Sequence, residues 1–417
     1  MVYLKTVVLL AVIAVYQISS QNNVPIRASK ETLEKIDGEL RNKIAEERGN
    51  LRLAAGFVRL SFHDCVGEGR CDGCIDSGNP DNNGLQRYID VLSGVYNDHK
   101  DEITRADLFA FAGVVAANEA SREDAQFDMS HFKVGRADCS SDGQENDPNE
   151  HFPGNNMQNL GEVTKFFNAA FGLNEQESVA LMGAHSLGRM ETRNSGYEGP
   201  WVNNIERLDS AYYQEVAERR WFLKVMPESN GQKHQWERRG PTGGSGNREG
   251  GNPGAKALLS TDGAIAFNMH LNQESGAFLD NQECSMCGVA NNPPRREAEC
   301  CEKNSGYNIC REYSANNPQW MNDFAGAFYK MIDSQQTNLS SPVSVTTTDA
   351  TTPRPTKAPK PGRKPGKKGK KGKKRQDFFH TKKSHNDAKS NRIRHRIQKL
   401  MKELREVSDQ VKKMKNY

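Results

Sequence analysis

The composition of the chain changes near residue 336, and this change most constrains what the chain can fold into. Residues 336–360 are rich in Ser, Thr and Pro, and residues 361–375 form a polybasic run with glycine at three-residue intervals. Neither composition can bury a core, and so few glycine triplets cannot build a collagen helix. We therefore expect a disordered linker over 336–385 and a folded body over 21–335, which has room for one large domain or two ordinary ones.

Charge divides the chain in the same region. From Arg354 to Tyr417 there are 24 Lys and Arg against 5 Asp and Glu, whereas the whole chain has a net charge of only +4, so the body is acidic. A tail this basic is either a solvated linker or a segment that binds polyanions by counterion release. We predict that residues 354–417 bind a polyanionic matrix, such as a glycosaminoglycan.

The last segment, residues 386–417, is predicted to form a basic amphipathic helix. Its apolar residues are spaced four and three apart, as in a coiled coil: Ile393, Ile397, Leu400, Leu404, Val407, Val411 and Met414. A helix this short is marginal alone, so the apolar seam over 393–414 requires a partner. That partner is a second copy of the helix, the acidic body or a membrane surface.

The first 20 residues have the pattern of a secretory signal peptide: one lysine, an apolar run over 6–16 and small residues at its end. The run is well short of a membrane span, and no other stretch is apolar enough to be one. We therefore predict a secreted, extracellular protein with no transmembrane segment. Asn338 begins a glycosylation sequon, which suits the same compartment.

The cysteines fit secretion. There are nine: Cys65, Cys71, Cys74, Cys139, Cys284, Cys287, Cys300, Cys301 and Cys310. In an oxidising compartment most should form disulfides, and an odd number leaves at least one free or bonded to another chain. The last five lie in an insertion at about residues 270–310, for which we favour disulfides over a zinc site.

Two segments of the mainly helical body carry candidate chemistry. Apolar residues recur with helical spacing over 106–120, 161–171 and 320–332, and strand-like alternation is rare. Arg59 and His63 are four residues apart and therefore share one helix face. A histidine there can move the proton of a bound peroxide, and an arginine can stabilise charge on the departing oxygen. Taken alone, a salt-bridged surface turn is the commoner explanation of such a pair.

The second segment is the apolar stretch 178–188, which contains His185. A satisfied core histidine is the simpler interpretation. The functional interpretation is an axial haem ligand, whose other ring nitrogen would need a carboxylate from elsewhere in the chain.

Together these motifs resemble those of plant-type haem peroxidases. Arg59-Leu-Ser-Phe-His-Asp-Cys65 resembles the distal motif of the secreted classes, and Gly183-Ala-His-Ser-Leu-Gly188 resembles the proximal motif. The stretch from Asn194 to Trp201 is similar to that of the intracellular class, which includes cytochrome c and ascorbate peroxidases. Further matches follow in the family's order: 82–85, 103–109, 132–138 and 311–315. The resemblance implies a two-lobed helical fold with haem b between the lobes.

The resemblance also implies roles for single residues. Arg59 and His63 match the distal acid–base pair, Phe62 the ring over the haem, and Asn82 the residue that orients the distal histidine. His185 matches the iron ligand.

On the proximal side, Trp201 matches the tryptophan beneath the haem. The carboxylate partner of His185 is Asp262 if Leu259-Ser-Thr-Asp262 aligns with the family's motif; a competing register places Ala255 there instead. We prefer Asp262, because an unpartnered ligand histidine is electronically costly.

Cation sites and one disulfide follow from the same resemblance. Asp64 and Asp72 match a distal calcium site, although Cys74 stands where a serine is expected and Asp76 is an alternative ligand. Cys65 and Cys71 resemble the short disulfide of secreted peroxidases.

A second cation site, for potassium or calcium, matches Ser186, Asn204 and Asp209. For both cation sites, ordinary surface acidity is the alternative explanation.

The function implied is reduction of hydrogen peroxide with one-electron oxidation of phenolic, protein-tyrosyl or other small donors, which would permit crosslinking of an extracellular matrix. Ascorbate is unsupported, because Asn194 stands where ascorbate peroxidases have arginine, although Arg193 is adjacent. The alternative is a catalytically weak or inactive matrix protein that keeps the fold and binds polyanions through its tail.

Overall fold

A computed structural model describes residues 26–66, 71–139, 152–153, 157–226, 233–238, 256–271, 284–287 and 299–344. The predicted signal peptide, the polybasic run and the C-terminal helix lie outside these residues. Among the described residues, no helix is long and apolar enough to cross a bilayer.

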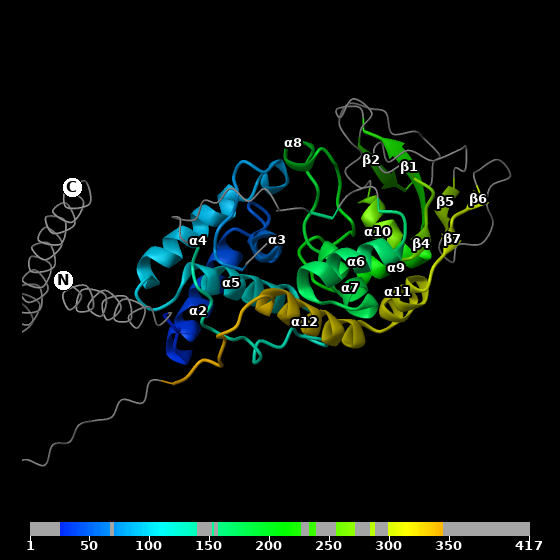
Figure 1. Ribbon diagram of the computed structural model, residues 1–417. Helices are drawn as coiled ribbons and strands as arrows, with labels where there is room; N and C mark the ends of the chain where they lie inside the picture. Colours follow the sequence, from blue (N-terminus) through cyan, green and yellow to red (C-terminus); the bar gives the residue numbers. More distant parts are fainter. Residues whose placement is uncertain are drawn as a thin grey trace, which may run out of the picture. The chain divides into compact units, whose positions relative to one another are not determined.

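The described body is mainly helical, as predicted (Figure 1). Its longer helices are α2 (Lys30–Glu46), α3 (Leu53–Cys65), α4 (Gln86–His99), α5 (Arg105–Ala120), α6 (Leu160–Phe171), α7 (Glu175–Met182), α9 (Ala211–Glu218), α11 (Gly306–Ala315) and α12 (Asn317–Asp333). Shorter helical segments are η1 (Pro80–Asn82), η2 (Gly183–Ser186), α8 (Thr192–Ser195) and α10 (Ser260–Ala264).

Helix α5 lies in the core and positions α3. Thr104 caps its start by accepting a hydrogen bond from the Asp107 backbone, and nearly every residue that follows is buried. Its most extensive helix contact is with α3. That contact is close because Gly113 has no side chain: a Cβ there would lie 2.4 Å from the Ser61 hydroxyl oxygen. The packing holds the helix that carries Arg59 and His63 against the core.

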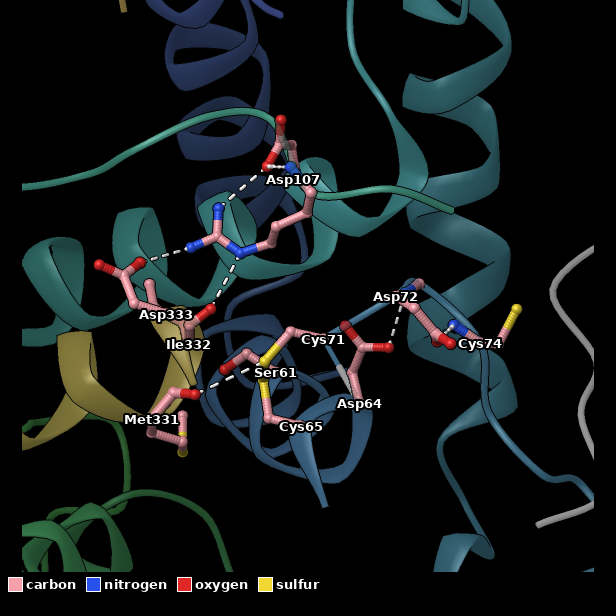
Figure 2. The surroundings of a disulfide bond; sticks show 12 residues. Ser61, Asp64, Cys65, Cys71, Asp72, Cys74, Asp107, Met331, Ile332 and Asp333 are labelled. Atoms are coloured by element: carbon pink, nitrogen blue, oxygen red, sulfur yellow. Dashed lines mark hydrogen bonds and ion pairs between the residues drawn. A yellow bond between two sulfur atoms is a disulfide. The ribbon is translucent and has the colours of Figure 1, made fainter. Parts of the chain in front are cut away.

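A buried arginine joins the end of α12 to the start of α5 (Figure 2). The Arg136 guanidinium has no exposed surface and lies 2.9 Å from Asp107 Oδ1 and 2.8 Å from Asp333 Oδ1. Its Nε also donates to the Ile332 carbonyl, at 2.9 Å. Removing either aspartate would leave buried positive charge without compensation. The arginine and its two aspartates therefore hold together two helices that are far apart in the sequence.

The described residues also form a sheet that helical periodicity did not predict. Its strand order is β3-β2-β1-β5-β6, all antiparallel except the β5–β6 pair. The strands are β1 (Arg220–Val225), β2 (His234–Glu237), β3 (Ala257–Leu258), β5 (Cys284–Cys287) and β6 (Glu299–Cys300); a separate pair joins β4 (Phe267–Asn268) to β7 (Glu302–Lys303). These strands are too short for alternation to stand out in the sequence. Helix α10 packs beside β2 and β3.

Disulfides hold the cysteine-rich insertion, as predicted. Cys284 bonds to Cys301 and Cys287 to Cys300, which ties β5 to the segment around β6. Among the described cysteines, only Cys310 is free, and it is buried.

The body continues past residue 335, where the sequence predicted the linker to begin. Ser340 forms an antiparallel bridge with Val134, and the Lys30 backbone N–H donates to the Val343 carbonyl. Arg27 donates to the Ser340 hydroxyl and to the Asn338 carbonyl. The segment to residue 344 therefore packs on the body; a Ser/Thr composition does not exclude edge pairing through the backbone.

Candidate active site

Helix α3 places Arg59 and His63 side by side, one turn apart. The Arg59 Nε donates to the His63 Nε2 at 3.3 Å. The two other guanidinium nitrogens donate to the carbonyls of Asp81 and Asn83, at 2.8 and 3.1 Å. The loop around η1 thus holds the arginine over the histidine.

Asn82 fixes the tautomer of His63. The Asn82 side-chain nitrogen donates to the Asp76 carbonyl at 2.9 Å, so its amide oxygen faces the ring. That oxygen lies 2.7 Å from His63 Nδ1, which must therefore carry the proton. His63 Nε2 is left as an acceptor, which is the form that a general base requires.

The environment of His63 keeps the ring neutral. Burial lowers its pKa well below the ordinary value, and the nearby positive charge of Arg59 lowers it further; the hydrogen bond with Asn82 only partly opposes this. His63 is therefore uncharged at neutral pH and able to accept a proton.

Aromatic rings enclose the distal histidine. Phe62 packs edge-on to His63 with ring centroids 5.6 Å apart, and also contacts Phe171. The ring of Phe152 lies closer, at 4.3 Å from His63. Phe152 belongs to no motif and lies 89 residues along the chain from His63, so the sequence does not indicate this contact.

On the proximal side, His185 lies at the end of an apolar segment and meets Asp262. The His185 Nδ1 is 2.6 Å from Asp262 Oδ1, and Asp262 is fully buried. Thus Asp262 stands where the sequence called for a carboxylate, while the competing Ala255 lies outside the described residues.

Asp262 joins four groups, and we call this set the Asp262 hub. Besides His185, its oxygens accept from Trp201 Nε1 at 2.8 Å, from the Tyr212 hydroxyl at 2.8 Å and from the Leu259 backbone N–H at 2.6 Å. The rings of His185 and Trp201 stack with centroids 4.3 Å apart. The sequence does not indicate a role for Tyr212, because a tyrosine in an amphipathic helix looks like an ordinary core residue.

The predicted distal cation residues lie close to the Cys65–Cys71 disulfide, which forms as the resemblance implied (Figure 2). Asp64 is buried; its Oδ1 accepts from the Gly73 N–H, while its Oδ2 has no partner among the described residues. Burial and the negative charge of Asp72 raise the pKa of Asp64 well above the ordinary value. An orphaned buried carboxylate oxygen that feels the charge of a second carboxylate fits a hard cation such as calcium.

Of the predicted proximal cation residues, the structure brings two together. The Asp209 backbone N–H donates to the Ser186 hydroxyl at 3.3 Å. Burial raises the pKa of Asp209, although the Ala211 N–H opposes this. Asn204 accepts from the Glu206 N–H and has no described contact with Ser186 or Asp209.

A cavity of about 390 Å³ lies around α8; it is lined by Arg52, Arg189, Glu191, Thr192, Arg193 and Glu198. Helix α8 packs against η1, so the cavity adjoins the loop that holds Asn82 and Arg59. Its arginines are paired: Glu191 lies 3.6 Å from Arg52 and 2.9 Å from Arg193, and Glu198 accepts from Arg189. The cavity is therefore polar, but most of its charge is offset.

The described residues form a mainly helical fold with two sets of candidate active-site residues. One set holds a histidine beside an arginine, and the other holds a histidine bound to a carboxylate. Residues 36–266, more than half of the chain, match the family model described as Peroxidase. The chain therefore belongs to the peroxidase family, in the plant, fungal and bacterial superfamily of haem peroxidases.

Similar proteins agree with this assignment. The chain is 37% identical over 149 residues to a Mycosarcoma maydis protein described as a heme-binding peroxidase, which covers 36% of this chain and 42% of that protein. It is 32% identical over 204 residues to L-ascorbate peroxidase 3 of Arabidopsis thaliana, covering 43% and 65%. It is 28% identical over 207 residues to mitochondrial cytochrome c peroxidase of Candida albicans, covering 46% and 53%. The chain thus spans about half the length of the relatives it matches.

The residues present fit a haem. Asp262 occupies His185 Nδ1, so Nε2 is the nitrogen left to bind iron. The His185 side chain is 31% exposed, although its neighbours Gly183 and Ser186 are buried. His185 thus combines a partly exposed side chain with an Nδ1 that is already held, which leaves Nε2 to act as an iron ligand.

Proposed function

We propose that this protein is a haem peroxidase that reduces hydrogen peroxide and takes electrons one at a time from small donors. The observation that carries the proposal is that His63 and His185 are both held by oxygen at Nδ1, so that both present Nε2. One is buried, neutral and beside an arginine, which suits proton transfer; the other is held by a carboxylate, which suits metal binding.

His185 Nε2 would hold the iron of a bound haem, which would supply a redox centre between the peroxide and the electron donor. His63 Nε2 takes the proton from the near oxygen of the peroxide and delivers it to the far oxygen, which departs as water. For this the Arg59 Nε must leave His63 Nε2 and turn toward the departing oxygen, where its charge stabilises the transition state. Asp262 orients His185 and strengthens its Nε2 as a ligand, and Phe62 and Phe152 exclude water around His63.

The test is the rate of the peroxide reaction in purified, haem-loaded protein. His63→Ala should slow it about 10²- to 10⁴-fold, the contribution of a general acid–base residue, with the Soret band retained. His131→Ala is the matched control, because His131 is exposed and belongs to neither set of candidate active-site residues. A rate that survives His63→Ala unchanged, or wild-type protein that takes up no haem, would refute the proposal.

For the electron donor, we propose neutral phenols and tyrosyl side chains rather than ascorbate. The arginines of the cavity around α8 are already paired with Glu191 and Glu198, which leaves little net charge to attract an anion. Steady-state assays with a guaiacol-type phenol, ascorbate and a reduced cytochrome should therefore favour the phenol. A higher kcat/KM for ascorbate would overturn this choice.

We also propose calcium at Asp64 and Asp72, and potassium or calcium at Ser186 and Asp209. The support is the orphaned, buried Asp64 oxygen and the raised pKa of both Asp64 and Asp209, which indicates carboxylates whose burial the surrounding positive charges do not offset. Metal analysis of the dialysed protein tests the proposal directly; metal-free protein of unchanged stability would contradict it.

A second function, binding of polyanions by a secreted protein, rests on the charge of residues 354–417. Polyanion binding is compatible with peroxidase catalysis. It would be the main function if the protein takes up haem but does not catalyse peroxide reduction. Protein lacking these residues should elute from heparin at much lower salt than the full chain. Retention that persists without them would overturn the role of the tail, and full-length protein found only inside expressing cells would overturn secretion.

A further inference from the structure

A row of three packed tyrosines leads from the Asp262 hub to the partly exposed carboxylate of Asp323; the last of the three, Tyr313, is itself buried. The Tyr212 ring contacts the His185 ring edge-on, with centroids 6.0 Å apart. Tyr212 then contacts Tyr213 at 5.1 Å, and Tyr213 contacts Tyr313 at 5.1 Å. These are ordinary distances for packed aromatic pairs, so the rings are continuous from the proximal histidine to Tyr313.

The three hydroxyl groups differ in what accepts their proton. Burial raises the pKa of each tyrosine above its ordinary value, so each is protonated at neutral pH and must lose its proton when it loses an electron. Tyr213 donates only to the backbone carbonyls of Val179 and Ala180, which cannot take up a proton. Tyr213 can therefore pass an electron between Tyr212 and Tyr313, but it cannot hold a stable radical.

Tyr212 and Tyr313 each donate to a carboxylate, but the two carboxylates differ. A proton moved to Asp262 would neutralise the fully buried group that holds His185 and Trp201. Tyr313 donates at 2.8 Å to Asp323, which is partly exposed and also receives hydrogen bonds from Gln176 and Gln319. Burial alone would raise the pKa of Asp323, but the hydrogen bonds from Tyr313, Gln176 and Gln319 outweigh it and lower that pKa. Asp323 is thus ionised at neutral pH and can accept the proton at the surface.

We propose that Tyr212, Tyr213 and Tyr313 form a relay that carries an oxidising equivalent from the proximal side to the buried Tyr313, which takes an electron from a donor too large for the cavity around α8 when that donor approaches the partly exposed Asp323. The inference rests on the proposed function, since hydrogen peroxide is the oxidant. Each peroxide takes up two electrons and two protons to give two waters. One of those electrons comes from Tyr313, whose phenolic proton moves to Asp323. An external donor phenol then returns one electron to the Tyr313 radical, and Asp323 returns the proton. A second donor phenol supplies the other electron, and the two donor phenols release the two protons that the peroxide takes up.

The surface over the relay is polar and has no described basic residue in contact with Asp323. Gln176 and Asn322 are exposed there, and both donate to the Asp323 carboxylate. Such a surface suits an uncharged macromolecular donor that carries phenol groups, which needs only to approach the carboxylate and not to enter a pocket.

The test detects the radical directly and locates it by substitution, because Tyr313 is buried and out of reach of a spin trap. Haem-loaded protein is mixed with one equivalent of hydrogen peroxide, without donor, freeze-quenched and analysed by electron paramagnetic resonance. We expect a tyrosyl signal. Tyr313→Phe should abolish most of that signal, and Asp323→Asn should reduce it because the proton acceptor is gone.

The matched control is Tyr307→Phe, on the same helix as Tyr313. Tyr307 donates to the Ala217 carbonyl and lies outside the relay, so its loss should leave the signal unchanged. Cys310→Ser removes the nearby buried thiol as a competing site and should also leave the tyrosyl signal in place. A tyrosyl signal that survives Tyr313→Phe, or a thiyl or tryptophanyl signal in place of the tyrosyl signal, would overturn the relay.

A kinetic comparison separates the relay from the proposed function. With guaiacol, Tyr313→Phe should turn over like the wild type; with phenol groups coupled to dextran it should lose most of its rate. Equal rates with both donors would refute the relay while leaving the peroxidase intact. Loss of the Soret band or of guaiacol turnover in the wild type would instead refute the proposed function itself.

Discussion

The distal and proximal histidines are each held by an oxygen at Nδ1, but the two oxygens differ in charge. His63 meets the neutral amide oxygen of Asn82, whereas His185 meets the carboxylate of Asp262. The amide sets the tautomer of His63 and leaves the ring neutral, with Arg59 beside it. The carboxylate pulls the Nδ1 proton of His185 toward itself and strengthens Nε2 as a ligand. The same ring thus becomes a proton shuttle on one side and a metal ligand on the other.

Removing the proximal ring should have the largest effect. His185→Ala leaves no nitrogen ligand opposite the distal pair, so we expect loss of the Soret band after desalting, and its return when imidazole is added. The measurement is the absorption spectrum of reconstituted protein. His270→Ala, which lies near β4 but outside the site, is the control and should retain haem. A normal spectrum for His185→Ala would show that the two histidines have been assigned to the wrong sides.

Removing the distal charge should slow the reaction and shift its pH dependence. Arg59→Leu removes the residue that stabilises the departing oxygen, at a cost of about 10²- to 10³-fold in rate. It also removes one of the two causes that lower the pKa of His63, so that pKa should rise toward its ordinary value. Because only neutral His63 reacts, the acid limb of the rate profile should move to higher pH.

Arg59→Lys is the control for this experiment, because it keeps the positive charge but not the fork of nitrogens. Its acid limb should stay close to that of the wild type. If Arg59→Leu instead leaves the acid limb where it is, burial alone sets the pKa of His63.

Exchanging the proximal carboxylate for an amide would make the two sides alike. Asp262→Asn should weaken the His185–iron bond and lower activity about 10- to 100-fold, the usual cost of losing a ligand's partner. Haem affinity and the reduction potential, which should rise, are the measurements. Asp262→Ala should in addition destabilise the fold, because each buried donor of the hub left unpaired costs about 1–3 kcal/mol. If Asp262→Asn leaves the reduction potential unchanged, the charge of the group at Nδ1 is not what distinguishes the proximal histidine from the distal one.

The smallest effect concerns the carboxylate next to the distal histidine. If a cation is bound at Asp64, Asp64→Asn and treatment with EGTA should each lower the melting temperature by a few degrees, about 1 kcal/mol in a domain of this size. If Asp64 has no cation, Asp64→Asn should instead be neutral or stabilising, since it removes an unpaired buried charge. The sign of the change decides between these two cases. Asp90→Asn, on the partly exposed side of α4, is the control.

The sequence predicted the distal side better than the proximal side, for a physical reason. Arg59 and His63 lie on one helical turn, so their spacing alone implies that they are neighbours. The proximal pair is separated by 77 residues, and the sequence left two registers open, Asp262 and Ala255. The packing of α10 beside β2 and β3, strands too short to be recognised in the sequence, brings Asp262 to His185.

By itself, the sequence determined the helical class, the family motifs, the cysteine pattern and the charge of residues 354–417, because each depends on composition or on contacts within a turn or two. Only the tertiary structure decided that Tyr212 joins the Asp262 hub, that Phe152 packs on His63, that residues 336–344 return to the body, and that Tyr213 and Tyr313 line up behind the hub. These contacts join segments distant in the chain, and their partners are chosen by how helices and strands pack, which no local spacing records.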